Sequence, residues 1–293
     1  MTRLEWPTIA LTLFIHGAWL VLTWHAATLA WWIACPAGAV LIAWHSSLQH
    51  ELIHGHPTAS RAINDALASV PLSLWLPFPI YRDSHLQHHR DAHLTDPLED
   101  PESRYVTPAA WAGFGALRRA ALNAQMTLAG RLLIGPFWSI GGFLIAEAAH
   151  LARSADSRRI WTEHIALCLP VLLWLGPVCH VGFAYYMFGM VLPGTSLLLI
   201  RSFAEHRAAA DPARRTAVVE GSWLLGPLFL FNNLHAAHHA APGIPWYRLP
   251  RWYHAHRAAL LHANGGLVYR GYADLARRFL LRRHDSPALP GRG

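Results

Sequence analysis

Cysteine and charged residues are scarce in this sequence. It has three cysteines in 293 residues, and 14% of its residues are charged, whereas 53% are hydrophobic. Cys35, Cys168 and Cys179 each lie in an apolar run and form no C-x-x-C pair, which excludes a disulfide framework or thiolate metal site built on spacing. The low charge and high apolar content argue against a disordered chain and against an ordinary soluble domain. They favour a protein partly embedded in lipid.

Lysine is absent, so all 24 basic residues are arginines, and they exceed the 17 acidic residues by seven. The arginines are scattered over loops and a C-terminal tail instead of lining one helix with interleaved aromatic residues. That distribution predicts no nucleic-acid partner. Anionic lipid head groups match it better.

Long apolar runs predict membrane-spanning helices, each close to the roughly 20 residues needed to cross a bilayer. Residues 8–24 and 27–45 form a first predicted hairpin, and residues 161–201 form a second, with its turn near Gly176-Pro177. A fifth run, residues 132–150, is interrupted by glycine and proline. Because no small-residue cleavage site follows the first run, we interpret it as a retained anchor.

The arginine distribution also predicts the topology. No arginine occurs between Arg3 and Arg61 or between Arg159 and Arg201, so both hairpin turns are expected outside the cell and the remainder in the cytoplasm. Arginines on both flanks of residues 132–150 predict an interfacial or re-entrant helix there. The expected fold is a single all-α integral-membrane domain with four transmembrane helices in two hairpins. Residues 46–130 and 202–293 would form its cytoplasmic helical cap.

Histidine is abundant, with 21 residues; eight of them follow a repeated spacing, and a ninth stands alone near the last apolar run. At such spacings, imidazoles share one face of a helix. All are expected at the cytoplasmic membrane surface. They are His50 and His54, then His85, His88 and His89, then His235, His238 and His239, and finally His206 just past the last predicted crossing.

Nine imidazoles are too many for one tetrahedral site. A structural zinc site closes at four ligands, whereas nitrogen-rich sites with open positions suit redox-active iron, so two irons sharing these histidines is the economical interpretation. Metal-binding histidines usually donate their second ring N–H to a carboxylate or carbonyl. The carboxylates close enough in sequence to accept it are Glu51, Asp83, Asp91 and Glu205, and Asp96, Glu99 and Asp100 could add to them.

These three clusters resemble the histidine boxes of the membrane fatty acid desaturase superfamily, which are integral-membrane di-iron enzymes. The resemblance covers roughly residues 10 to 255 and follows the family's order, with a long membrane-containing gap before the third box. His206 matches the family's additional histidine. Asn233, two residues before the third box, is a plausible polar neighbour of the metals.

The resemblance implies an oxidoreductase with two non-haem irons and O2 as co-substrate. The substrate would be a lipid acyl chain, which loses two hydrogens from adjacent carbons to leave a double bond. The nine histidines would be the iron ligands, and no nucleophile is needed. Electrons would come from an external ferredoxin or cytochrome. The expected location is a bacterial inner membrane, with the active site on the cytoplasmic face.

Two alternatives remain open at the level of sequence. A membrane di-iron hydroxylase or ketolase acting on an alkyl or carotenoid substrate would carry similar boxes, and residues 231–239 also resemble those of carotenoid ketolases and hydroxylases. A histidine-rich metal transporter would need its histidines at mid-membrane depth. The clusters flank the apolar runs instead, which disfavours transport.

Overall fold

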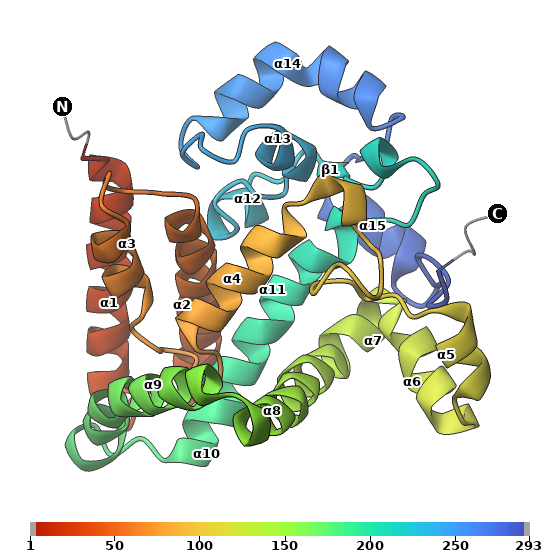
Figure 1. Cartoon of the computed structure of the whole chain (residues 1–293). Helices are drawn as coiled ribbons and strands as arrows, with labels where there is room; N and C mark the ends of the chain where they lie inside the picture. The colour runs from red at the N-terminus through yellow and green to blue at the C-terminus, as the bar shows by residue number, and fades with distance from the viewer. Residues whose placement is uncertain (1–3, 290–293) are drawn as a thin grey trace. The chain divides into compact units, whose positions relative to one another are not determined.

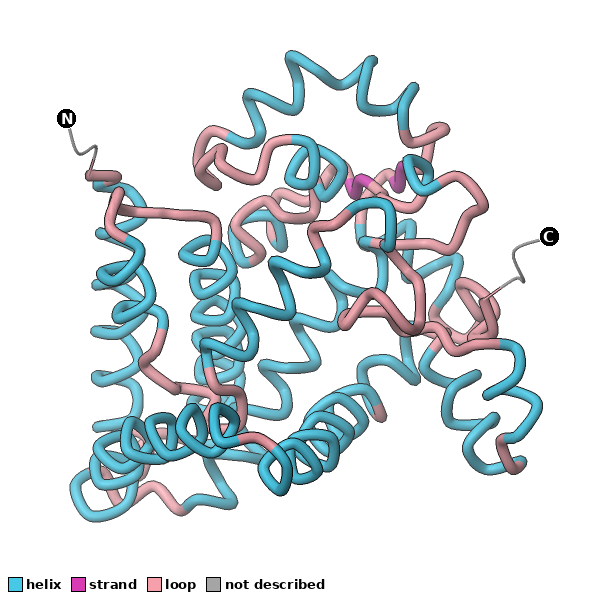
Figure 2. The backbone as a smooth tube through the Cα atoms, in the orientation of Figure 1, coloured by secondary structure: helices cyan, strands magenta, loops and turns pink. Residues whose placement is uncertain are grey.

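The computed structural model describes residues 4–289, apart from the side chain of Asp91, and is mostly helical (Figures 1 and 2). The chain folds into two compact units. The first comprises the chain up to Arg82 together with Pro136–Leu198, and the second comprises Asp83–Gly135 together with the chain from Leu199 onward. The predicted predominance of helix is confirmed.

The first unit is built on long apolar helices. The buried Trp19 indole donates a hydrogen bond to the Tyr186 hydroxyl over 2.9 Å, and that hydroxyl donates to the Leu72 carbonyl over 2.7 Å. These bonds satisfy polar groups that burial would otherwise penalise. The helices are α1 (Trp6–His25), α2 (Trp31–Ile53), α3 (Arg61–Ala68), α8 (Gly135–Arg153), α9 (Ala155–Leu173), η2 (Trp174–Val178), α10 (Phe183–Tyr186) and η3 (Met187–Val191), while α4 (Phe78–His88) and α11 (Leu192–Glu205) continue into the second unit.

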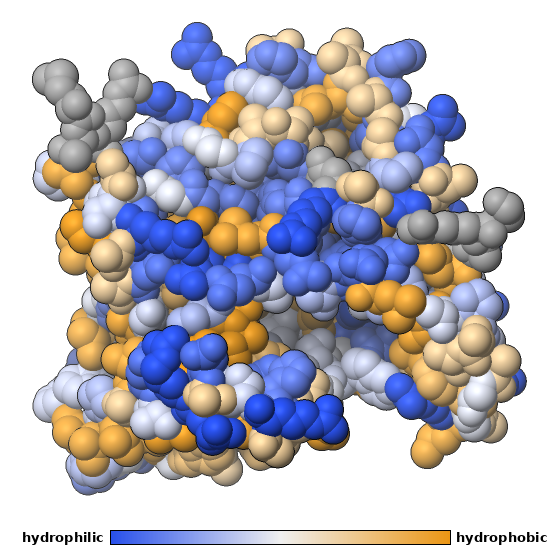
Figure 3. Space-filling model, viewed as in Figure 1, coloured by the Kyte–Doolittle hydropathy of each residue, from blue (hydrophilic) through white to orange (hydrophobic). Residues whose placement is uncertain are grey.

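Within residues 4–289, three helical segments are long and apolar enough to cross a membrane: Trp6–His25, Ala155–Val178 and Phe183–Glu205. Many of their apolar side chains face outward; Leu13, for example, is 70% exposed. Figure 3 shows hydrophobic residues, in orange, along the lower left edge of this view. In water this surface would be costly, and hydrocarbon would cover it.

The second hairpin and the fifth apolar run each differ in one detail from the sequence-based expectation. The helix continues through Gly176-Pro177 as the π-helical turn η2, and the reversal follows at residues 179–182. A π turn accommodates a proline by rearranging the local hydrogen bonds. The expected interruption at Gly135-Pro136 is present, because one helix ends at Leu133 and α8 begins at Gly135. At Gly141-Gly142, however, α8 continues, because glycines inside a helix weaken it without ending it.

Close packing of α2 against α11 depends on Gly194. A β-carbon added there would lie 2.8 Å from both the Ala39 carbonyl oxygen and the Ile42 β-carbon. We therefore expect Gly194→Ala to destabilise the protein by about 1–3 kcal/mol, because the two helices would have to separate. Thermal unfolding in detergent measures the change. Gly17→Ala in α1, where a β-carbon meets nothing within 4 Å, is the matched control and should be neutral or stabilising.

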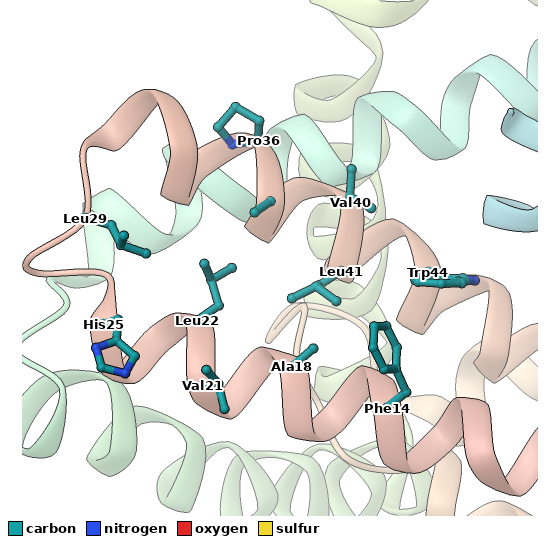
Figure 4. Close-up of a pocket in the computed structure, with 11 residues that line it drawn as sticks. Phe14, Ala18, Val21, Leu22, His25, Leu29, Pro36, Val40, Leu41 and Trp44 are labelled. Carbon is teal, nitrogen blue, oxygen red and sulfur yellow. The ribbon is translucent and has the colours of Figure 1, made fainter.

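An apolar groove of about 620 Å³ runs between α1 and α2. In Figure 4, Phe14 and Leu22 of α1 and Leu41 of α2 point into it. Pro36 lies inside α2 on the lining of the groove, where a proline cannot complete the helical hydrogen-bond ladder. The lining suits hydrocarbon more than a polar ligand.

The second unit surrounds a short parallel pairing of β1 (Val218–Val219) with β2 (Val268–Tyr269), in which Val218 is opposite Val268. Phe203, Val219, Tyr269 and Leu275 form one of its buried clusters. Figure 2 shows the two strands as the short magenta segment. The remaining elements are η1 (Asp91–His93), α5 (Pro108–Gly113), α6 (Ala116–Gln125), α7 (Leu128–Leu133), η4 (Pro212–Arg214), α12 (Leu225–Leu228), α13 (His235–Ala240), α14 (Leu249–Ala263) and α15 (Tyr272–Phe279).

Candidate metal centre

The third histidine cluster lies on the short helix α13, which is fixed by its alanines. Ala236 donates its backbone N–H to the Ala217 carbonyl over 3.0 Å, and both Ala236 and Ala237 are buried in the cluster that contains Val218 and Tyr253. With the small residues packed on one side, the histidines at i, i+3 and i+4 share another face. The helix therefore presents several imidazoles in a fixed orientation.

Four histidines of the second unit, which we call the four-histidine group, converge from three segments. They are His88 at the end of α4, His206 directly after α11, and His235 and His239 on α13. The Nε2 atom of His206 lies 3.0 Å from that of His88 and 2.9 Å from that of His235. The Nε2 atoms of His235 and His239 are 3.2 Å apart.

A second convergence, the three-histidine group, contains His85, His89 and His238. The Nε2 atom of His89 lies 3.0 Å from that of His85 and 3.1 Å from that of His238. The two groups adjoin, because the rings of His89 and His239 stack with their centroids 4.3 Å apart. Both H-x-x-H-H motifs therefore contribute to both groups.

These separations fit metal coordination. Two nitrogens bound at about 2.1 Å and about 90° apart would lie about 3.0 Å from each other, whereas a tetrahedral angle would separate them by about 3.4 Å. The observed spacings of 2.9–3.2 Å match the smaller angle. Angles near 90° belong to octahedral-type sites that can keep positions open, which suits iron better than structural zinc.

The Nδ1 atoms of three of these histidines contact oxygen atoms. The Nδ1–H of His88 donates to Asp100 and that of His85 donates to Glu102, each over 2.9 Å. The Nδ1 atom of His235 lies 3.0 Å from the Asn232 amide oxygen and 3.3 Å from a Glu205 carboxylate oxygen. Such contacts fix the tautomer and leave the Nε2 lone pair for a metal.

Asp100 also organises the loop that carries it. One of its oxygens accepts the Thr95 backbone N–H over 2.9 Å, and the oxygen that faces His88 accepts the Glu102 N–H over the same distance. Thr95 has a φ of +66°, an unusual backbone conformation for a β-branched residue. The strained loop is thus pinned by the same carboxylate that orients His88, as is common at functional sites.

Burial and nearby charges shift the pKa values of these histidines in different directions. Burial lowers the pKa of His206 and His235 well below the usual value, so both rings are neutral near pH 7. Burial acts in the same direction on His88, but the Glu102, Asp100 and Glu205 carboxylates together outweigh it and raise the pKa of His88 to about 9. Without metal, a proton on His88 therefore occupies a position that faces His206.

The structure places the other predicted residues in several environments. His50 and His54 lie one turn apart at the end of α2 in the first unit, with ring centroids 5.1 Å apart. In that unit a Glu51 oxygen lies 3.8 Å from the Nε2 atom of His56. Asp83 is exposed on α4, and the Asp91 side chain lies outside the described part of the chain.

Sequence reasoning did not identify two of the oxygen acceptors at the site, Asn232 and Glu102. Asn233 donates to the Val219 carbonyl over 2.7 Å, and it is the neighbouring Asn232 that contacts His235. Glu102 was not singled out, although it follows a run of acidic residues after the second cluster. The acidic run was the only signal for Glu102 in the sequence. Glu102 lies 17 positions after His85, too far for helical spacing to pair the two residues.

Comparison with known proteins gives two matches. Residues 23–272 match the family model described as fatty acid desaturase. The chain is also 27% identical over 275 residues to a beta-carotene ketolase of Paracoccus sp. (strain PC1), in an alignment that covers 83% of this chain and 90% of the ketolase.

Proposed function

Because this chain belongs to the fatty acid desaturase family, we propose that it is a membrane oxidoreductase in which two irons and O2 desaturate a fatty acyl chain. The observation that supports the proposal most strongly is the four-histidine group, in which neighbouring Nε2 atoms lie about 3 Å apart and the Nδ1 atoms of His88 and His235 contact oxygen atoms. When bound, iron supplies the oxidising chemistry, because an alkyl C–H bond offers no acidic proton to a side-chain base.

The protein's own contribution is orientation and electrostatics. In this proposal the four-histidine group would hold one iron and the three-histidine group would hold the other, while His50 and His54 stay predicted ligands on the resemblance alone. Asp100, Glu102 and Asn232 keep His88, His85 and His235 in the tautomer that offers Nε2. The negative charge of the Asp100 and Glu102 carboxylates would also offset the charge of bound cations.

We also propose the membrane arrangement that the arginines predict. The three apolar segments and α2 would make four crossings, and α8, with exposed Phe137 and Ile145, would lie in the interface. The histidine groups would then face the cytoplasm, where an external electron donor reaches them. A bacterial inner membrane is the proposed location.

A second candidate activity is ketolation of a carotenoid, which the likeness to a beta-carotene ketolase favours. Desaturation uses one O2, two electrons and two protons for each double bond, and it releases two waters. Ketolation of a methylene uses twice as much of each reactant and releases three waters. The two activities therefore differ in oxygen consumed per product as well as in the product itself.

Lipid mass spectrometry distinguishes the two candidates. The protein would be produced in a host that makes fatty acids and carotenoids, with His238→Ala as the inactive control. We expect acyl chains that have lost two hydrogens at one position. New carbonyl oxygen on a carotenoid, with unchanged acyl chains, would instead establish the ketolase. No difference between the two cultures would contradict both activities.

The raised pKa of His88 predicts how metal affinity depends on pH. Below about pH 9, a metal must displace the proton of His88. The apparent metal affinity should therefore fall by up to about tenfold for each unit by which the pH is lowered. His206 and His235, whose pKa values are lowered, should add no further dependence near neutral pH. Competition for Zn²⁺ with a chelator at pH 6.5, 7.5 and 8.5 measures the slope. An affinity that is constant over this range would contradict the prediction.

A further inference from the structure

A basic pocket lies in the second unit, on elements that follow His206 in the chain. Its volume is about 460 Å³, and its lining includes Arg207, Arg214, Arg278, Tyr269 and Asp285. The three arginines come from separate segments, and all three are exposed. Three guanidinium groups around one concave surface favour an anionic partner.

The surrounding sequence adds to this positive charge. Residues 207–289 contain eleven arginines and four acidic residues. Arg214 lies 3.4 Å from Asp211, and Arg278 lies 3.6 Å from Asp274, but both arginines are at least half exposed. Exposed pairs of this kind are weak and exchange readily with a partner's charges. The pocket therefore keeps a positive potential despite its local carboxylates.

The loop containing Gly265 and Gly266 packs closely against the side chain of Arg214. Gly265 and Gly266 have φ values of +68° and +75°, in the left-handed region that glycine adopts without strain. A β-carbon on Gly265 would lie 3.1 Å from the Arg214 Cδ atom. The glycine thus leaves room for the stem of Arg214, which lines the pocket.

A series of hydrogen bonds connects this pocket with the four-histidine group. Tyr269, on the pocket wall, has its hydroxyl 2.6 Å from the Nε2 atom of buried His284. The His284 Nδ1 atom lies 3.1 Å from Arg104 Nη2. This Arg104 nitrogen also donates to the His206 carbonyl over 2.6 Å. Arg104 also donates to the Phe203 carbonyl over 2.8 Å, which fixes its position.

The chemistry of each group fixes the direction of these bonds. A guanidinium group can only donate, so His284 accepts at Nδ1 and carries its proton on Nε2, which donates to the Tyr269 oxygen. Burial, together with Arg104 and other nearby arginines, lowers the pKa of His284 to about 2, consistent with this neutral tautomer. The series is thus a defined arrangement of bonds from the pocket wall to a histidine of the metal centre.

We propose that the pocket formed by Arg207, Arg214 and Arg278 docks an acidic one-electron carrier protein, and that Tyr269, His284 and Arg104 link the docked carrier to His206. The inference rests on the proposed function, which requires external electrons. In each encounter the carrier loses one electron and the metal centre gains one, so two encounters supply the two electrons of desaturation, while the protons come from solvent. Anionic lipid is the rival occupant, but it would need no bonded connection to His206.

Binding of a plant-type [2Fe–2S] ferredoxin, used as the acidic probe, tests the docking surface. The full chain would be loaded with redox-inactive Zn²⁺ in neutral-lipid nanodiscs, and the dissociation constant would be measured at several salt concentrations. We expect Arg214→Glu/Arg278→Glu to weaken binding by at least about tenfold and to reduce the salt dependence. Arg248→Glu/Arg251→Glu reverses the same number of exposed arginines at the start of α14, outside the pocket, and should have little effect.

The outcomes separate the possibilities. Equal weakening by both double variants, or no salt-dependent ferredoxin binding, would overturn the proposal. Unchanged ferredoxin binding together with lost binding to phosphatidylserine vesicles in Arg214→Glu/Arg278→Glu would assign the pocket to lipid and overturn it as well. Lipid products formed with dithionite as the reductant test the proposed function separately, because they need no carrier.

The bonded link has its own readout. Tyr269→Phe removes one hydroxyl and leaves the ring in place, so ferredoxin should bind with unchanged affinity. Electron transfer from flash-reduced ferredoxin into the iron-loaded protein, measured without O2 or substrate, should slow several-fold. An unchanged transfer rate would contradict the role of this series.

Discussion

Replacing His88 or His238 by alanine is expected to abolish product formation and to lower the iron content, while the protein remains in the membrane. His88 belongs to the four-histidine group and His238 to the three-histidine group, so each change removes one Nε2 donor from a different group. Loss of a residue that merely orients a ligand typically costs 10–100-fold, so loss of a ligand should reduce activity by more than about 100-fold. Iron analysis and lipid mass spectrometry of purified variants measure both effects.

His262→Ala is the matched control for these two changes. His262 lies on α14 in the same unit and is exposed, so its loss should leave iron content and activity close to those of the original protein. Equal losses in the control would indicate general damage to the fold. Full activity in either His88→Ala or His238→Ala would show that the ligand assignment is wrong.

Asp100→Asn should have the second largest effect. The Asp100 carboxylate accepts hydrogen bonds from the His88 ring and from the Thr95 and Glu102 backbone. An asparagine keeps the size but replaces one oxygen with an NH2 group, which would then face a donor. We expect a 10–100-fold loss of metal affinity, because His88 loses both its orientation and the adjacent negative charge. Titration of the metal-free protein with Zn²⁺ measures the change.

A charge-matched substitution nearby separates this effect from general electrostatics. Glu99 is exposed on the same loop, one residue before Asp100, so Glu99→Gln removes an equal charge. Its effect on Zn²⁺ affinity should be small, because solvent screens exposed charges. If both variants lost affinity equally, the orienting role of Asp100 would be excluded.

The long helices were predictable because lipid imposes a simple pattern on the sequence. The expected first segment, residues 8–24, corresponds to α1 (Trp6–His25) within a few residues. The turn of the second hairpin, after α9, was harder to place. Gly176-Pro177 is part of a π-helical turn that hydropathy does not reveal. Glycines 141 and 142 suggested a break, yet α8 runs through them. Local breaker residues bias a helix, and their surroundings decide whether it ends.

The histidine boxes could be found from sequence because helical spacing alone places imidazoles on one face. Their carboxylate partners could not be assigned in the same way. Glu102 reaches His85 through a loop whose path depends on Asp100 and Thr95, and proximity in sequence favoured Asp83 instead. Asn232 and Asn233 are adjacent, and only the backbone path through Leu230 and Phe231, both with positive φ, decides which amide meets His235.

The most direct test of a paired iron centre is anomalous diffraction at the iron absorption edge from crystals of the iron-loaded protein. We predict two peaks, one within bonding distance of the Nε2 atoms of His88, His206, His235 and His239, and the other within bonding distance of those of His85, His89 and His238. A single peak, or peaks away from these rings, would contradict the account.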